Sequence, residues 1–208
     1  GNENFLPSVF EDSNFYSTFG YLRLDSLDDK FFPKRGVFFD GDFHLYLFSS
    51  DYHQDFNQFS ITRGSLGYVY SPFKNVTGRI STETGFRIGQ EGINSLGFFL
   101  GGYGNNLINN LIPFYGYDFL SIAGDSYVKG MVELDFEIFR KNHIIASANF
   151  ANVENDLYST GSWFKKPTYS GYALGYGIET FMGPLEAKYS YSPEIKKSQW
   201  FISLGFWF

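Results

Sequence analysis

The sequence contains no cysteine. Disulfide bonds, thiolate metal sites and cysteine nucleophiles are therefore excluded, and strand pairing and packing must stabilise the fold. No run of about 18 consecutive apolar residues occurs, which excludes a transmembrane α-helix. Positive charge is also scarce, because 16 Lys and Arg face 22 Asp and Glu for a net charge of -6. Nucleic acid rewards clustered Lys and Arg, so we expect no nucleic-acid partner.

Aromatic residues, by contrast, make up 22% of the chain, with 26 Phe and 16 Tyr. The mean hydropathy is nevertheless only -0.20. This combination is typical of a membrane β-barrel, in which aromatic girdles and an apolar outer band are averaged against a polar interior. We expect an all-β fold, with residues 1–13 as an N-terminal segment or partial strand and residues 14–208 as one antiparallel transmembrane β-barrel domain.

Alternation of apolar and polar residues predicts about nine strands, within a range of eight to ten. Their lengths of roughly 9 to 14 residues suit tilted strands that cross a bilayer. The predicted strands cover residues 14–24, 37–47, 58–70, 76–88, 128–138, 143–153, 170–181, 185–192 and 200–208. Barrels of this class normally have an even number of strands. Either Phe5–Phe10 or Ser95–Gly102 therefore adds a strand, or the chain is part of a larger barrel, such as one of 16 strands.

One face of these strands is apolar and the other carries charges of both signs. Such a charged face needs water or opposite charges, because an unpaired buried ion costs several kcal/mol. The expected lumenal charge network consists of Asp40, Asp42, Arg79, Glu83, Arg87, Lys129, Glu133, Asp135, Glu137, Glu186 and Lys188. Because the two signs are interspersed, structural pairing is favoured over a selective pathway, although a conduit stays possible.

The last nine residues alternate strictly and end on phenylalanine. Their apolar face consists of Trp200, Ile202, Leu204, Phe206 and Phe208. A terminal edge strand this aromatic and uncharged would be an aggregation hazard in water. The hazard disappears when the strand is part of a closed barrel whose outer face contacts lipid.

Several segments carry a family resemblance in their order along the chain. Residues 24–36 have paired acids followed by Phe-Pro-x-x-Gly, residues 99–102 and 113–117 form two parts of a long loop, and residues 175–186 contain Gly-x-Gly and Gly-Pro-Leu. Together with the aromatic terminal strand, they resemble the C-terminal half of a BamA-type barrel of the bacterial surface antigen family. The terminal strand then resembles the signal that the barrel assembly machinery reads.

This resemblance implies a lipid-facing wall and a polar lumen that the long extracellular loop enters. The tip of that loop would be Phe114, Tyr115, Gly116 and Tyr117. Tyr115 stands where the family has an arginine, so the contact of that arginine with lumenal acids is not carried over. A loop packed on the rim of the barrel stays the alternative to a lumenal plug.

The Phe-Tyr-Gly-Tyr, Gly-Pro-Leu-Glu and Leu-Gly-Phe-Trp-Phe segments most resemble the barrel that follows a patatin-like phospholipase domain. That domain needs a Gly-x-Ser-x-Gly motif, and the nearest string, residues 63–67, lacks the first glycine. Asp42 and His44 share a strand face, but no serine has a context that marks it as their nucleophile. We therefore expect this chain to have no enzymatic activity, catalytic residue, cofactor or metal, and any hydrolase domain to lie upstream.

The resemblance implies the bacterial outer membrane, with residues 90–125 and 154–169 outside the cell. The expected function is to anchor, insert or translocate a polypeptide or passenger domain. Expected partners are outer-membrane lipid, the barrel assembly machinery, and a passenger domain or second barrel chain. Trp163, Trp200 and Trp207 suit girdle anchoring better than sugar or protein binding. The alternatives are a passive pore, an adhesion barrel that binds a partner through its outer loops, and a soluble ligand-binding barrel.

Overall fold

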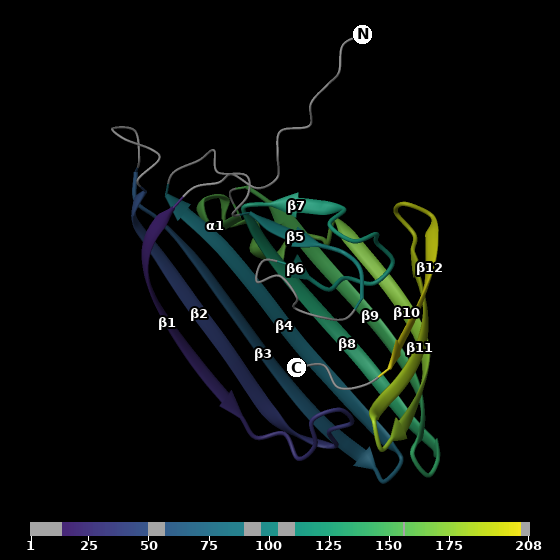
Figure 1. Ribbon diagram of the computed structural model, residues 1–208. Coiled ribbons are helices and arrows are strands. Elements are labelled where there is room, and N and C mark those ends of the chain that lie inside the picture. Colours follow the sequence, from purple (N-terminus) through teal and green to yellow (C-terminus); the bar gives the residue numbers. More distant parts are fainter. Residues whose placement is uncertain (1–13, 50–56, 90–96, 104–110, 156, 205–208) are drawn as a thin grey trace.

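The computed structural model describes residues 14–49, 57–89, 97–103, 111–155 and 157–204. Nine strands form one antiparallel sheet in the order β1-β2-β3-β4-β8-β9-β10-β11-β12 (Figure 1). The strands are β1 (Phe15–Asp25), β2 (Arg35–Ser49), β3 (Phe59–Phe73), β4 (Val76–Gly89), β8 (Ser126–Phe139), β9 (Asn142–Glu154), β10 (Tyr169–Thr180), β11 (Gly183–Ser192) and β12 (Lys197–Leu204). The predicted all-β antiparallel fold and its nine strands are confirmed.

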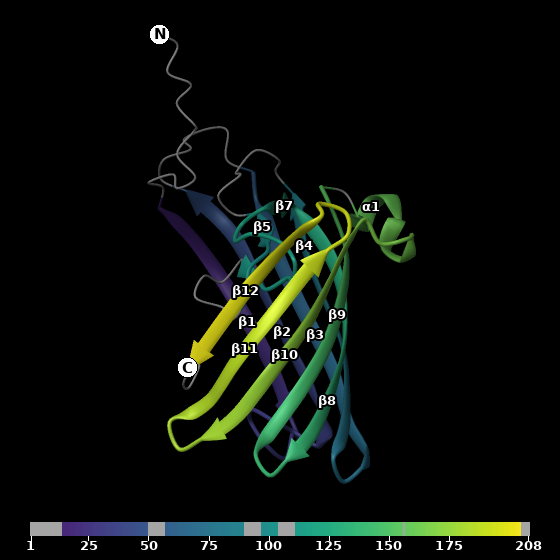
Figure 2. The ribbon, with the colours of Figure 1, turned by 90° about the vertical axis from the view of Figure 1, so that its right-hand side faces the viewer.

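A second sheet of three short strands is inserted between β4 and β8. It has the order β6-β5-β7, formed by β5 (Phe98–Leu100), β6 (Leu111–Ile112) and β7 (Ile122–Gly124). Both views place it inside the curve of the large sheet (Figures 1 and 2). The alternative in which Ser95–Gly102 adds a strand to the wall is therefore wrong, because its described part pairs within this inner sheet. Phe5–Phe10 lies outside the described residues.

The register of the large sheet separates an inner face from an outer face. Ile80 pairs with Tyr68 and Val132 on the outer face, whereas the adjacent Arg79 pairs with Val69 and Glu133 on the inner face. Neighbouring side chains point to opposite faces of a strand, so each hairpin continues this division. The inner face is the one that contacts the inserted sheet, and most of the outer face is exposed.

The exposed part of the outer face is strongly apolar. In β12, Trp200, Ile202 and Leu204 are 73%, 80% and 59% exposed, as expected for lipid-facing side chains. Phe206 and Phe208 lie outside the described residues. Other exposed apolar side chains on this face are Val37, Phe43, Leu66, Tyr68, Ile80, Val132, Leu134, Leu174 and Tyr189. An apolar surface of this extent is far larger than a soluble monomer normally leaves exposed.

The two ends of the sheet have different connections. Short turns at residues 74–75, 140–141 and 181–182 lie at one end, together with the β1–β2 connection at residues 26–34 (Figure 1). The connections from β4 to β8 and from β9 to β10 lie at the other end, together with the short turn between β11 and β12. The connection between the strands predicted at 58–70 and 76–88 is shorter than that prediction implies, because β3 continues through Pro72 to Phe73, with a register shift between Tyr70 and Phe73. Residues 157–168 include the helix α1 (Leu157–Thr160) and the 3-10 turn η2 (Ser162–Phe164). Among the described helices, none has the length and apolar character to span a membrane.

A charge placed on the outer face tests the orientation of the wall. Val132→Arg puts a cation in the middle of β8, and we expect it to lower the unfolding free energy in a phospholipid bilayer by about 2–4 kcal/mol. Phe139→Arg, at the end of the same strand, is expected to cost only about 0–1 kcal/mol. Denaturant unfolding of both variants in bilayers gives the comparison. Equal costs for the two variants would contradict the membrane-facing orientation.

Candidate functional site

The eleven charged residues predicted for the lumen all lie on the inner face of the sheet. Each of them has an opposite charge within 4.0 Å, counting His143 as protonated. Four pairs form among the predicted residues themselves: Arg79–Glu133, Lys129–Glu83 and Lys188–Glu186, each at 3.3 Å, and Lys188–Glu133 at 4.0 Å. Such pairing offsets the cost of removing charges of both signs from water.

Five residues that form ion pairs with the predicted lumenal charges were not predicted from the sequence. They form the pairs Asp40–Arg23 at 2.6 Å, Asp42–Arg63 at 2.6 Å, Arg87–Asp125 at 3.1 Å, Glu137–Lys34 at 2.8 Å and Asp135–His143 at 2.9 Å. Arg63 lies in a strand whose alternation is weak, and Lys34 and Asp125 lie in connections. The excess of acidic over basic residues in the predicted set is a signal that could have indicated the missing cations, because buried acids need positive partners.

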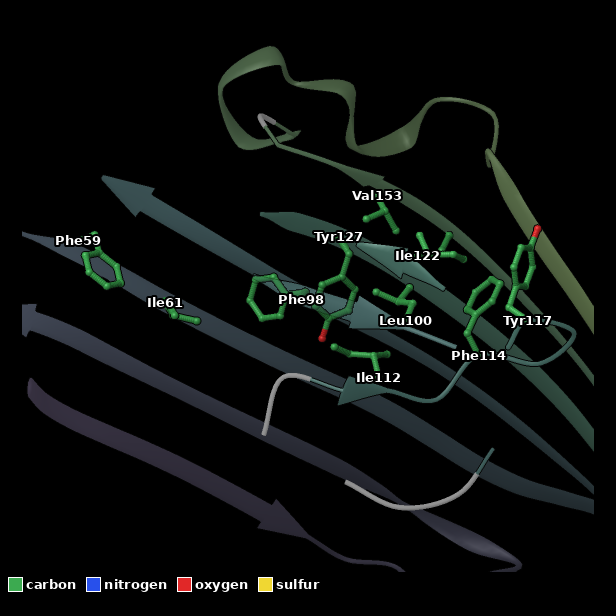
Figure 3. Close-up of a cluster of buried hydrophobic side chains, with 11 residues drawn as sticks. Phe59, Ile61, Phe98, Leu100, Ile112, Phe114, Tyr117, Ile122, Tyr127 and Val153 are labelled. Carbon is green, nitrogen blue, oxygen red and sulfur yellow. The ribbon is translucent and has the colours of Figure 1, made fainter. Parts of the chain in front are cut away.

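The inserted segment between β4 and β8 packs against the wall through a hydrophobic cluster. Phe98, Leu100, Ile112, Phe114, Tyr117 and Ile122 of this segment meet Phe59, Ile61, Tyr127, Ala151 and Val153 of the wall (Figure 3). The ring of Phe98 stands edge-on to Tyr127 at 4.9 Å. Phe114 and Tyr117 are 1% and 3% exposed. These two residues of the predicted loop tip are therefore buried against the wall.

The backbone of the loop tip lies very close to β10 and β11. Gly116 has φ of 82°, and a Cβ there would lie 2.8 Å from the backbone nitrogen of Ser192. On the opposite side, a Cβ on Gly171 would lie 1.8 Å from the carbonyl oxygen of Tyr115. The Tyr115 N–H donates a 3.1 Å hydrogen bond to Asn149 Oδ1. Only glycine at 116 and 171 allows this approach.

A lysine from the wall holds the aromatic side of the tip. Lys188 Nζ lies 5.0 Å from the centre of the Tyr103 ring and 5.6 Å from that of Tyr115, which suits cation–π attraction. The same nitrogen lies 3.3 Å from Glu186 and 4.0 Å from Glu133. Tyr103 also donates a hydrogen bond to Glu186. The wall thus supplies a cation beside Tyr115, the residue that stands where the BamA-type family has an arginine.

The turn between β1 and β2 covers the inner face from the other end. Asp29 accepts the backbone N–H groups of Phe31 and Phe32 at 2.8 and 2.9 Å, which shapes the turn. Asp28 accepts the N–H of Lys34 at 2.8 Å, and this hydrogen bond lowers the pKa of the Asp28 carboxyl. The Phe32 ring stacks on the buried His143 ring at 4.0 Å. The paired acids, Asp28 and Asp29, therefore stabilise the turn through backbone hydrogen bonds, and the turn places Phe32 on the inner face of the sheet.

A cavity of about 510 Å³ remains between the loop tip and this turn. Tyr103 and Tyr115 border it at the loop, and Phe31, Phe32 and Pro33 border it at the turn. Charges of both signs line it, including Arg79, Glu83, Lys129, Glu133, Asp135, Glu186 and Lys188. This mixture suits a hydrated, neutralised interior better than selection of one kind of ion.

A metal site and a catalytic acid–histidine pair are the two kinds of centre with which the described residues can be compared. The described residues hold no cluster of three or more side chains suited to a metal ion. His44 Nε2 lies 3.9 Å from Asp42, but Asp42 already accepts three hydrogen bonds from Arg63, at 3.0, 3.2 and 2.6 Å. What the geometry does provide is a docked loop over a charged chamber.

The buried tyrosines of the loop give the docked state a pH dependence. Burial raises the pKa of both Tyr103 and Tyr115 above the ordinary value of 10.0. A raised pKa in the docked state means that its stabilisation is complete below about pH 10 and is lost as the pH rises through the raised value. We expect the difference in near-ultraviolet absorbance between the unaltered protein and Tyr103→Phe/Tyr115→Phe, which reports these two tyrosines, to titrate above pH 10. A difference signal that titrates at pH 10 would contradict burial of the tip.

Comparisons with known proteins agree with this architecture. The solved structure of BamA from Haemophilus ducreyi lacking POTRA domains 1-3 is similar, with a TM-score of 0.66 and 13% sequence identity over 90% of this chain and 40% of that one. The chain thus spans less than half of the BamA chain, and at this identity the likeness concerns the fold alone. No curated protein sequence matches the chain. Residues 2–208 match the family described as the OMP85 superfamily. The chain therefore belongs to the OMP85 superfamily, whose β-barrels reside in outer membranes.

Proposed function

We propose that the chain forms the plugged wall of a bacterial outer-membrane barrel that anchors, inserts or translocates a polypeptide or passenger domain. The docking of the loop tip between Lys188, Gly171 and Asn149 is the observation that carries this proposal. A loop held inside the wall favours an interior that is closed at rest and opens only when the loop moves.

The contacts of the tip suit a reversible plug. Its polar contacts are Lys188 with the two tyrosines, the Tyr115 N–H with Asn149, and a 3.3 Å hydrogen bond from Tyr117 to Glu194. Water can replace such contacts at a modest net cost, since each is worth about 0.5–1.5 kcal/mol. A translocating polypeptide could replace the loop tip in these contacts, while the ion pairs of the wall stay in place.

The two edges of the sheet support a larger assembly. Within the described residues, β1 pairs only with β2, and β12 pairs only with β11. Hydrocarbon does not solvate free N–H and C=O groups, so an open edge does not persist in a membrane. We propose that further strands complete the wall, from a longer polypeptide that carries a patatin-like passenger domain or from a second barrel chain. The barrel part itself then performs no catalysis, and the assembly machinery reads its terminal strand.

Single-channel conductance tests the plug. The protein should be almost closed in a planar bilayer, and Lys188→Met should raise its open probability because the tip loses its cation. Gly171→Ala should do the same, because its Cβ would meet the Tyr115 carbonyl at 1.8 Å. Gly177→Ala is the matched control on the same strand face, since its Cβ would meet only ordinary contacts at 3.4 Å and beyond.

The outcomes separate the proposal from its alternatives. A steady, open conductance in the unaltered protein that neither variant changes would contradict the plug and favour a passive pore. Folding of each variant is checked by its resistance to unfolding in detergent, so that a disordered barrel is not mistaken for an open one. An increase for Lys188→Met and Gly171→Ala, but not for Gly177→Ala, supports the proposal.

A further inference from the structure

Residues 157–168 fold back over the outer face of the wall instead of extending away from it. Asn152 pairs with Val128 on the outer face, yet it is only 4% exposed. Its side chain donates a 3.1 Å hydrogen bond to the carbonyl of Lys165 and accepts from the backbone N–H and the hydroxyl of Thr168 at 3.0 Å. The end of this connection is therefore fixed to the outer surface of β9. We refer to Leu157–Thr168 as the outer cap.

Two further contacts extend the outer cap across β8 and β4. Ser126, an outer-face residue that is fully buried, accepts the N–H of Leu157 at 3.0 Å and donates to the carbonyl of Glu154 at 2.6 Å. The Trp163 ring packs edge-on against the outer-face Phe86 at 4.3 Å. Figure 2 shows α1 outside the curve of the sheet, away from the inner strands β5 and β7. The cap thus lies on the membrane side of the wall.

The position of the cap along the strands matches a membrane border. Phe86 lies ten residues from Val76 at the other end of β4. At about 3.4 Å per residue and a tilt of about 40°, this stretch rises by about 25 Å, the usual height of the apolar band of a barrel. The cap therefore sits where the apolar band ends and lipid headgroups begin.

The side chains of the cap have the chemistry of that border. Phe164 is 98% exposed, so its ring has no packing partner in the described part of the chain. Lys165 and Lys166 follow it directly, and both are exposed. Lys165 forms an ion pair with Glu154, whereas the described residues provide no ion pair for Lys166. An exposed ring beside free positive charge suits the region where acyl chains meet phosphate groups.

We propose that the outer cap is a lipid-headgroup site, in which Phe164 enters the acyl region and Lys166, with Lys165, binds the phosphate of an anionic lipid. This site lies on the opposite face of the wall from the loop plug, and it does not depend on what the barrel transports. It fixes the depth of the wall at one membrane surface.

Bromine quenching of Trp163 fluorescence tests the site. The protein carries Trp200→Phe and Trp207→Phe so that Trp163 is the reporter, and it is folded into phosphatidylcholine vesicles with 20 mol% of brominated lipid. Brominated phosphatidylglycerol should quench Trp163 more than brominated phosphatidylcholine does. Lys166→Gln should lower this preference about fivefold, the effect expected for one lysine near a membrane surface. Lys196→Gln, an exposed lysine outside the cap, is the matched control and should change nothing.

Each other outcome overturns the proposal. Equal quenching by the two brominated lipids would mean that the cap contacts lipid without choosing its headgroup. Absence of quenching by either lipid would place the cap in water or against a protein partner. Phe164→Ala, which removes no packing within the described fold, should weaken quenching by both lipids, and unchanged quenching would contradict insertion of its ring. None of these results bears on the conductance of the barrel, so the site and the plug are tested separately.

Discussion

The pairing of charges on the inner face is the interaction on which the rest of the structure depends. A sheet whose outer side faces hydrocarbon has only one side on which to place ionised groups, and there they are crowded together. Arg79 and Glu133, Lys129 and Glu83, and Lys188 and Glu186 are each 3.3 Å apart. With these charges paired, the inner face can support a hydrated chamber and a docked loop.

The loop uses the same charges to hold its tip. Lys188 belongs to the wall network through Glu186 and Glu133, and it also lies beside the rings of Tyr103 and Tyr115. The wall therefore provides the cation and the tip provides the aromatic surface. Burial keeps these tyrosines neutral, which leaves the lysine as the charged partner. A contact of this kind holds the tip in place and remains open to competition from water or a polypeptide.

The sequence allowed the strands to be predicted because an alternation of period two survives on both faces of the wall. It did not give the pairings across strands: Arg63 with Asp42, and His143 with Asp135, depend on the register between neighbours. The fit of the loop tip depends likewise on Gly171, which meets Tyr115 only in three dimensions. The outer cap was not predicted because the sequence of residues 155–168 shows no periodicity. Asn152 looks like an ordinary strand residue in the sequence, and only the structure shows its hydrogen bonds to Lys165 and Thr168.

The central claim is that hydrocarbon contacts one face of the wall and the charged chamber occupies the other. Because the chain has no cysteine, single cysteines can carry a spin label at two adjacent pairs of positions, Ser65 with Leu66 and Ile80 with Ser81. Collision with oxygen dissolved in the bilayer is the direct measurement. We expect frequent collisions for labels at 66 and 80 and far fewer at 65 and 81. Equal collision rates within each pair, or the reverse order, would contradict the account.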